Sequence, residues 1–137
     1  MNDLPGKPVE TPKAWIRFAE GDIAVVEREM KTELPVHHTV CFLCQSAAEK
    51  FLKGYLISRG WKLQKTHDVV ELLGYCVDYD EELGSMIAEG AILNEYIVAG
   101  RYPGDVFTEH IDNNAAEEAL RAVQRIRSRV RDLMGKG

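Results

Sequence analysis

The stretch "VCFLCQSAAEKFLKGYLIS", residues 40–58, decides the fold. Its apolar side chains recur every three or four residues, which is the period of an α-helix. Two neighbouring apolar rows result, consisting of Val40, Leu43, Ala47, Phe51 and Tyr55, and of Cys41, Ala48, Leu52 and Leu56. A helix with so broad an apolar surface packs against several others. We therefore expect a central helix that begins near Pro35 and ends at Gly60, with this glycine in the left-handed conformation.

The rest of the chain shows the same helical spacing and no strand-like alternation of useful length. In the first helix, from Thr11 to about Met30, we expect Trp15, Phe18, Ala19 and Val26 to share the buried side. Three more helices are expected: one capped by Thr66, one from Asp78 to about Gly100, and one from about Asp112 to Met134. The prediction is an all-α fold, a single up-and-down bundle of about five helices. Residues 1–137 form one domain in this interpretation, with flexible ends at 1–10 and 135–137.

Composition narrows the possible functions. The 137 residues carry a net charge of −5, so binding to nucleic acid would need a local basic patch, and we expect no DNA partner. No apolar run approaches the roughly 20 residues of a membrane span, and residues 1–10 lack a signal-peptide core. We therefore expect a cytoplasmic protein that does not contact a membrane.

The three cysteines are Cys41, Cys44 and Cys76. An odd number argues against a disulfide framework. Cys41 and Cys44 have the spacing of redox motifs and zinc sites, but they lie in an apolar helical pattern without a second pair of ligands. We expect buried, unreactive thiols, no metal and no cofactor.

Several charged residues need an explanation. Asp22 falls on the apolar side of the first helix, where a lone carboxylate is costly unless it is paired. The last helix carries two rows of arginines, one of Arg121, Arg125 and Arg129 and the other of Arg127 and Arg131. These arginines either cover apolar surface and complement the helix dipole, or they contact phosphate.

The stretch "AGRYPGDV", residues 99–106, interrupts the helical pattern and contains Arg101 and Tyr102. An arginine fork binds phosphate, and a tyrosine can stack on a base. His67 precedes the third helix, whose N-terminus favours an anion, and a histidine can transfer protons near neutral pH. If the two loops meet at one end of the bundle, they form a phosphate site.

Each of these residues also has a structural alternative. His67 could bond a backbone carbonyl, and Arg101 could pair with Glu49 or Asp68. The remaining ligand candidates, Lys50 and Lys53, could form a solvated stripe or pair with Glu49.

Four stretches in order, "AWIRFAEGDI", "CQSAAEKFLKGYLISRGW", "THDVVELL" and "AGRYPGD", resemble the HEPN family of small helical domains. The resemblance implies a bundle of about five helices that is usually a homodimer. It also implies nucleotide binding, and often a partner that is a minimal nucleotidyltransferase, in a toxin–antitoxin-like pair. Modification of a tyrosine by such a partner would make Tyr102 the first candidate.

Many members of the HEPN family are metal-independent ribonucleases. In these members an arginine is followed, after about four to six residues, by a histidine. Here eight residues separate Arg101 from His110, so the spacing differs. We therefore favour a module that binds nucleotide or RNA phosphate and assembles with a partner. A ribonuclease using Arg101 with His67 or His110, or a dimeric scaffold without a ligand, are the alternatives. The sequence leaves open whether the protein is an enzyme.

Overall fold

A computed structural model describes residues 11–99, 108 and 110–135. Within these residues the secondary structure is entirely helical, which confirms the all-α prediction. The helices are α1 (Pro12–Glu29), α2 (His37–Ser58), α3 (Val69–Cys76), α4 (Glu81–Gly84), α5 (Ile87–Asn94) and α7 (Asn113–Met134).

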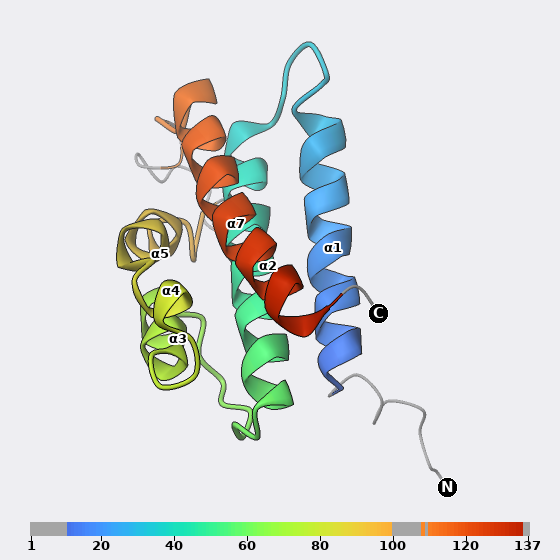
Figure 1. The fold of residues 1–137 in the computed structure, drawn as a ribbon. Coiled ribbons are helices and arrows are strands. Elements are labelled where there is room, and N and C mark those ends of the chain that lie inside the picture. The colour runs from blue at the N-terminus through green and yellow to red at the C-terminus, as the bar shows by residue number, and fades with distance from the viewer. Residues whose placement is uncertain (1–10, 100–107, 109, 136–137) are drawn as a thin grey trace, which may run out of the picture.

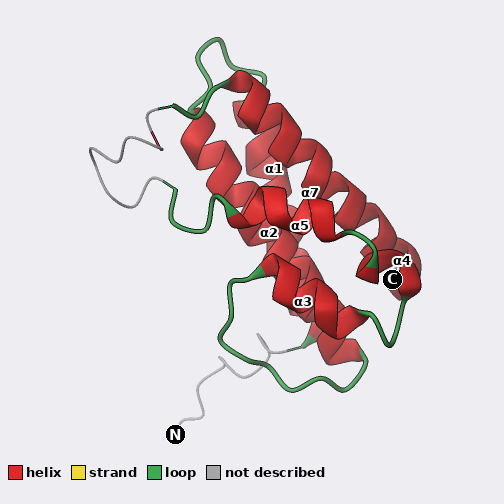
Figure 2. Cartoon of the chain, turned by 90° about the vertical axis from the view of Figure 1, so that its left-hand side faces the viewer, coloured by secondary structure: helices red, strands yellow, loops and turns green. Residues whose placement is uncertain are grey.

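Three long helices and three short ones form the described bundle. Helices α1 and α2 are antiparallel, and α7 crosses them while running in the direction of α2 (Figure 1). The short helices α3, α4 and α5 pack together on one side, against α2 and α7 (Figure 2). Helix α2 therefore lies at the centre, as its broad apolar surface predicts.

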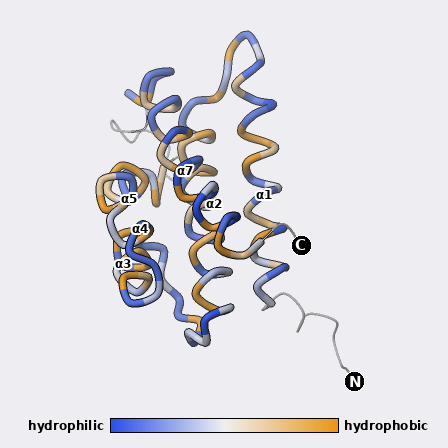
Figure 3. Tube along the Cα trace, in the orientation of Figure 1, coloured by the Kyte–Doolittle hydropathy of each residue, from blue (hydrophilic) through white to orange (hydrophobic). Residues whose placement is uncertain are grey.

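The core confirms most of the apolar pattern. Val40, Ala47, Phe51 and Leu56 of α2 are buried, and the buried residues of α7 recur at helical spacing. Figure 3 shows hydrophobic and hydrophilic residues alternating along the long helices, as expected for helices with one buried side. Gly60 has a φ of 95°, which confirms the left-handed end of the central helix.

The buried side of α1 differs from the prediction. Phe18 is 49% exposed and Trp15 is only half-buried. Ala19 and Val26 are buried as predicted, and Ile16 and Ile23 complete the buried side in place of Trp15 and Phe18. Helical spacing places Trp15 and Phe18 on the same side of α1 as Val26. In the structure, the neighbouring helices contact a side of α1 that is rotated toward Ile16.

The expected single helix from Asp78 to Gly100 is also wrong. Its described part is two helices, α4 and α5, and a turn at Ser85 and Met86 separates them. Asp80, not Asp78, caps α4 by accepting a hydrogen bond from the Leu83 amide at 2.9 Å. The turn allows Leu83 and Leu93 to be buried together.

The cap of α3 is Asp68 and not Thr66. The Asp68 carboxylate accepts a hydrogen bond from the Glu71 amide at 3.0 Å. Thr66 supports the cap from outside, since its hydroxyl accepts a hydrogen bond from the Asp68 amide at 3.1 Å. The Asp112 cap of α7 agrees with the prediction. None of the described helices combines the length and apolar character that a membrane crossing needs.

Candidate phosphate-binding site

The polar side of α2 includes the ammonium group of Lys53, and this side chain is almost completely buried. Gln45, Glu49 and Lys53 lie one turn apart, and Gln45 and Lys53 are 3% and 4% exposed. The Lys53 ammonium donates a hydrogen bond to Glu49 Oε2 at 2.7 Å. It also lies 5.7 Å from the centre of the Trp15 ring. A buried cation is tolerated only with such partners, so Lys53 and Glu49 depend on each other.

This pair supports His67. The Gln45 side chain donates a hydrogen bond to the His67 carbonyl at 2.8 Å. The other Glu49 oxygen lies 3.0 Å from His67 Nδ1. The imidazole remains 61% exposed, with Nε2 as its second ring nitrogen. A carboxylate on Nδ1 orients a histidine ring and leaves Nε2 to interact with a ligand.

The start of α3 is fixed to α5 by Asn94. The side-chain oxygen of Asn94 accepts a hydrogen bond from the backbone amide of Val69 at 2.8 Å. The side-chain nitrogen of Asn94 donates a hydrogen bond to the Asp68 carboxylate at 2.7 Å. The Glu71 amide and the Asn94 side chain hold the pKa of Asp68 below its usual range. The His67 backbone is therefore anchored by α2 just before Asp68 is anchored by α5.

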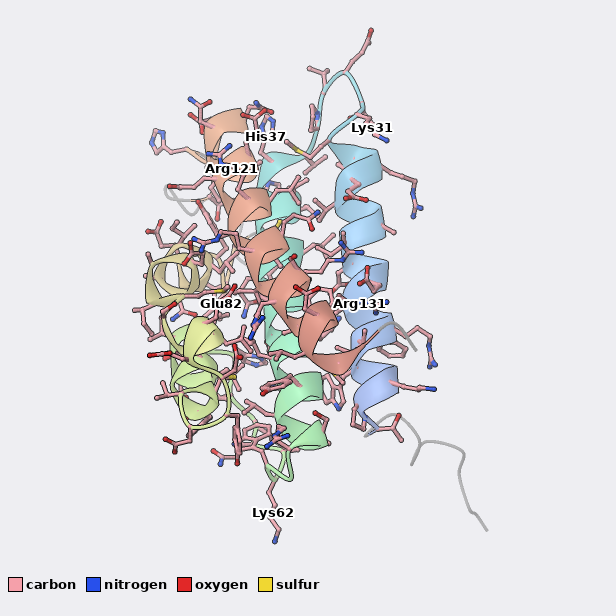
Figure 4. The ribbon with its side chains drawn as sticks, viewed as in Figure 1. Lys31, His37, Lys62, Glu82, Arg121 and Arg131 are labelled. Atoms are coloured by element: carbon pink, nitrogen blue, oxygen red, sulfur yellow. The ribbon has the colours of Figure 1, made fainter. Side chains whose placement is uncertain are left out.

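An unpredicted feature is the charge of the loop before α3. Residues 59–67, here called the basic loop, contain Arg59, Lys62, Lys65 and His67 and no acidic residue. All four of these side chains are exposed. Lys62 extends away from the bundle (Figure 4), and the Arg59 guanidinium lies 5.3 Å from the centre of the Tyr79 ring. The sequence alone could have indicated this patch, because Arg59, Lys62 and Lys65 follow one another without an acidic residue between them.

The structure separates the predicted site residues. Lys53 lies with His67 around Glu49, whereas the Lys50 ammonium is bound to Asp22 of α1 at 2.9 Å. This ion pair confirms that Asp22 needs a partner, and it removes Lys50 from the His67 cluster. His67 itself lies against the middle of α2, because Gln45 and Glu49 hold it there, and not at the end of the bundle.

Three further candidates lie elsewhere. Arg101 and Tyr102 are outside the described residues, so their relation to His67 stays a prediction. His110 is exposed in the turn that precedes α7. No hydrogen bond or ion pair joins His110 to the His67 cluster within the described part of the chain.

The arginine rows of α7 are mostly paired with acids from other segments. Arg125 binds Glu89, Arg127 binds Glu20 at 2.9 Å, and Arg129 binds Asp80 at 2.6 Å. Arg129 donates to both Asp80 oxygens, and it holds the pKa of that carboxyl below its usual range. These ion pairs give the three arginines a structural role other than the expected covering of apolar surface, and they count against a phosphate-binding surface.

The cysteines are buried, as predicted. Burial raises the pKa of Cys41 and of Cys76 to about 12, and it also raises the pKa of Cys44. Because the thiolate is the reactive form, these residues act as small apolar side chains. The described residues contain no cluster of three or more histidine, cysteine or acidic side chains that could hold a metal.

Comparison with known proteins supports the family resemblance. The family model of the HEPN domain matches residues 12–133. The crystal structure of ST0689, an archaeal HEPN homologue, has a TM-score of 0.72 and 21% identity and covers 91% of this chain and 98% of its own. The crystal structure of TT1696 from Thermus thermophilus has a TM-score of 0.72 and 25% identity, with 90% of this chain and 98% of its own covered. Curated proteins give no match. Because the family model spans most of the chain, this protein belongs to the HEPN domain family.

Proposed function

We propose that this protein binds the phosphate of a nucleotide or of RNA through the basic loop and His67, as a homodimer that pairs with a minimal nucleotidyltransferase. The observation that carries the binding proposal is the exposed His67 ring, held by the Glu49–Lys53 pair at the end of the basic loop. The family supports the dimer and the partner.

The chemistry of this surface suits a phosphate. A protonated His67 would donate from Nε2 to a phosphate oxygen while Glu49 accepts from Nδ1, and hydrogen bonds between charged groups are the strong ones. Lys62 and Lys65 are exposed and form no ion pair within the described residues, so their charge is available. On a protein of net charge −5, these cations form a local exception.

Binding is tested with ATP and with a fluorescent single-stranded RNA of about 12 nucleotides at low salt. The double variant Lys62→Glu/Lys65→Glu is expected to weaken RNA binding at least tenfold, because phosphate contacts dominate such affinity. The matched control is Arg28→Glu/Lys31→Glu, which makes the same charge change at two exposed positions near the end of α1. Equal losses in the two variants would show a net-charge effect and contradict this placement.

His67→Gln separates the histidine from the loop. It is expected to weaken binding of ATP and RNA, because the glutamine amide carries no charge and cannot form the charge-assisted hydrogen bond that the imidazole would donate to a phosphate. Arg101→Ala tests the predicted contribution of "AGRYPGDV". Absence of ATP and RNA binding by the folded wild-type protein would favour the dimeric scaffold.

The assembly is tested separately. Light scattering at micromolar concentration is expected to give the mass of a dimer. A neighbouring short reading frame for a nucleotidyltransferase, expressed together with this protein, is expected to copurify with it. A monomer, or no copurification, would remove the corresponding part of the proposal.

A second candidate function is metal-independent RNA cleavage, which the His67–Glu49 contact favours. A histidine oriented by a carboxylate is suited to proton transfer. Mixed RNA incubated with the protein in EDTA would then be degraded, and His67→Gln would abolish the degradation. RNA left intact by the wild type removes this function for that RNA.

A further inference from the structure

A second possible site lies where α1 begins and α7 ends. A groove of about 700 Å³ runs between these two helix ends. Its lining residues are Lys13, Ile16, Arg17, Glu20, Arg131, Met134 and Gly135. This volume lies within the range typical of small-molecule sites, about 300–1,000 Å³.

The rim of this groove has an excess of positive charge. Glu20 is the one acidic residue in its lining, and two arginines of α7 already neutralise it. Arg127 binds Glu20 at 2.9 Å, and Arg131 approaches it to 3.7 Å. Lys13 and Arg17 are exposed and have no acidic partner among the described residues. An anion in the groove would therefore meet two cations that no acidic group of residues 11–99, 108 and 110–135 binds.

The floor of the groove is apolar. Ile16 is 8% exposed, and Met134 is half-buried at the end of α7. The aliphatic stems of Lys13 and Arg17 extend this apolar surface, because long cationic side chains keep only their ends in water. A ligand with both an anionic group and an apolar body fits such a lining better than an inorganic anion.

The two helix ends give the ligand a direction. The N-terminus of α1 is the positive end of its dipole, and its first turn contains no acidic residue. The C-terminus of α7 is the negative end of its dipole and ends at Met134. The head group is therefore favoured at Lys13 and Arg17, and the apolar body at Met134.

We infer that this groove binds an amphiphilic anion, with its anionic head group at Lys13 and Arg17 and its apolar chain over Ile16 and Met134. The inference is independent of the proposed phosphate site, because the two sites share no residue.

Calorimetry with dodecanoate tests this assignment, below the concentration at which dodecanoate forms micelles and with the full chain. We expect one molecule bound per chain. Dodecyltrimethylammonium has the same chain length and a cationic head group, and it should bind at least tenfold more weakly. Equal affinity for the two amphiphiles, or no binding of dodecanoate, would overturn the inference.

Paired variants locate the head group. Lys13→Glu/Arg17→Glu should weaken dodecanoate binding at least tenfold, whereas Arg28→Glu/Lys31→Glu, with the same charge change at exposed positions outside both proposed sites, should stay within twofold of wild type. Circular dichroism verifies that each variant is folded, and Lys13→Gln/Arg17→Gln replaces the first variant if it is not. The same loss in both pairs would show that only net charge matters and would overturn the site.

Discussion

Three polar residues of α2 converge on one exposed side chain, whereas the arginines of α7 bind acidic residues in several other parts of the fold. On α2, Gln45, Glu49 and Lys53 together fix His67. On α7, successive arginines bind Glu89 of α5, Glu20 of α1 and the Asp80 cap of α4. One set of charges presents a group to solvent, and the other holds helices together.

The contrast between α2 and α7 indicates which charged side chains are available to bind a ligand. An arginine already paired with a carboxylate must lose that partner before it can bind a phosphate, while an exposed cation without an acid loses only water. By this criterion the basic loop is a better ligand site than α7, although α7 has more arginines. Substitutions in the two sets of charges test this contrast, and Asp80, which binds an arginine of α7, is expected to matter most for stability.

Asp80→Ala should have the largest effect on stability, a loss of about 2–4 kcal/mol of unfolding free energy. It removes a helix cap and the shorter of the two carboxylate contacts of the partly buried Arg129, which then keeps only Glu82 at 3.6 Å. Urea denaturation measures the loss. Asp78→Ala, at an exposed neighbour, is the control and should cost less than about 0.5 kcal/mol. Similar losses would show that Asp80 does not connect α7 to α4.

The same carboxylate predicts a pH dependence. Its pKa is lowered in the folded state, so its stabilisation is present above the unfolded value, about 3.9, and is lost as the pH falls through the lower folded value. The stability difference between wild type and Asp80→Asn should therefore shrink as the pH falls below about 4. A difference that stays constant down to pH 2 would contradict this linkage.

Lys53→Met should cost about 2–3 kcal/mol, because Glu49 keeps its burial but loses its main cation. Lys50→Met is the matched control, and it should cost about 1 kcal/mol, because the Lys50–Asp22 pair is more exposed. Thermal and urea unfolding measure both variants. Lys53→Met should also weaken any binding that depends on His67. If the two losses are equal, the Lys53 pair has no special role.

Asn94→Ala should cost about 1–2 kcal/mol, since the Val69 amide and the Asp68 carboxylate each lose a hydrogen-bond partner. Hydrogen exchange should show faster opening at the start of α3 than in wild type. Asn114→Ala, at an exposed position of α7, is the control. Unchanged exchange at Val69 would mean that Asn94 does not anchor this helix.

Arg125→Ala should have the smallest effect, below about 1 kcal/mol, because the arginine side chain is 62% exposed. The loss should decrease further in 0.5 M salt, which screens exposed pairs. Equilibrium unfolding at two salt concentrations measures it. A larger loss that does not respond to salt would place Arg125 with the buried network rather than with the exposed pairs.

Much of the fold was predictable because helical spacing is a local property. The residues of the central helix, its end at Gly60 and the Asp112 cap of α7 all follow from neighbours within a few positions. The orientation of α1 was not predictable in the same way. Several faces of that helix contain apolar residues, and only the positions of α2 and α7 decide that Ile16 is buried and Phe18 is exposed.

The candidate site shows the same division. The sequence by itself determined the helical class, the family motifs and the presence of His67, Glu49 and Lys53 at helical or loop positions. Only the tertiary structure decided that Glu49 binds both Lys53 and His67, that Lys50 turns to Asp22, and that Asn94 anchors α3. The physical reason is distance along the chain: a helical period involves residues three or four apart, whereas Asp22 and Lys50, or Asp68 and Asn94, are brought together only when separate helices pack.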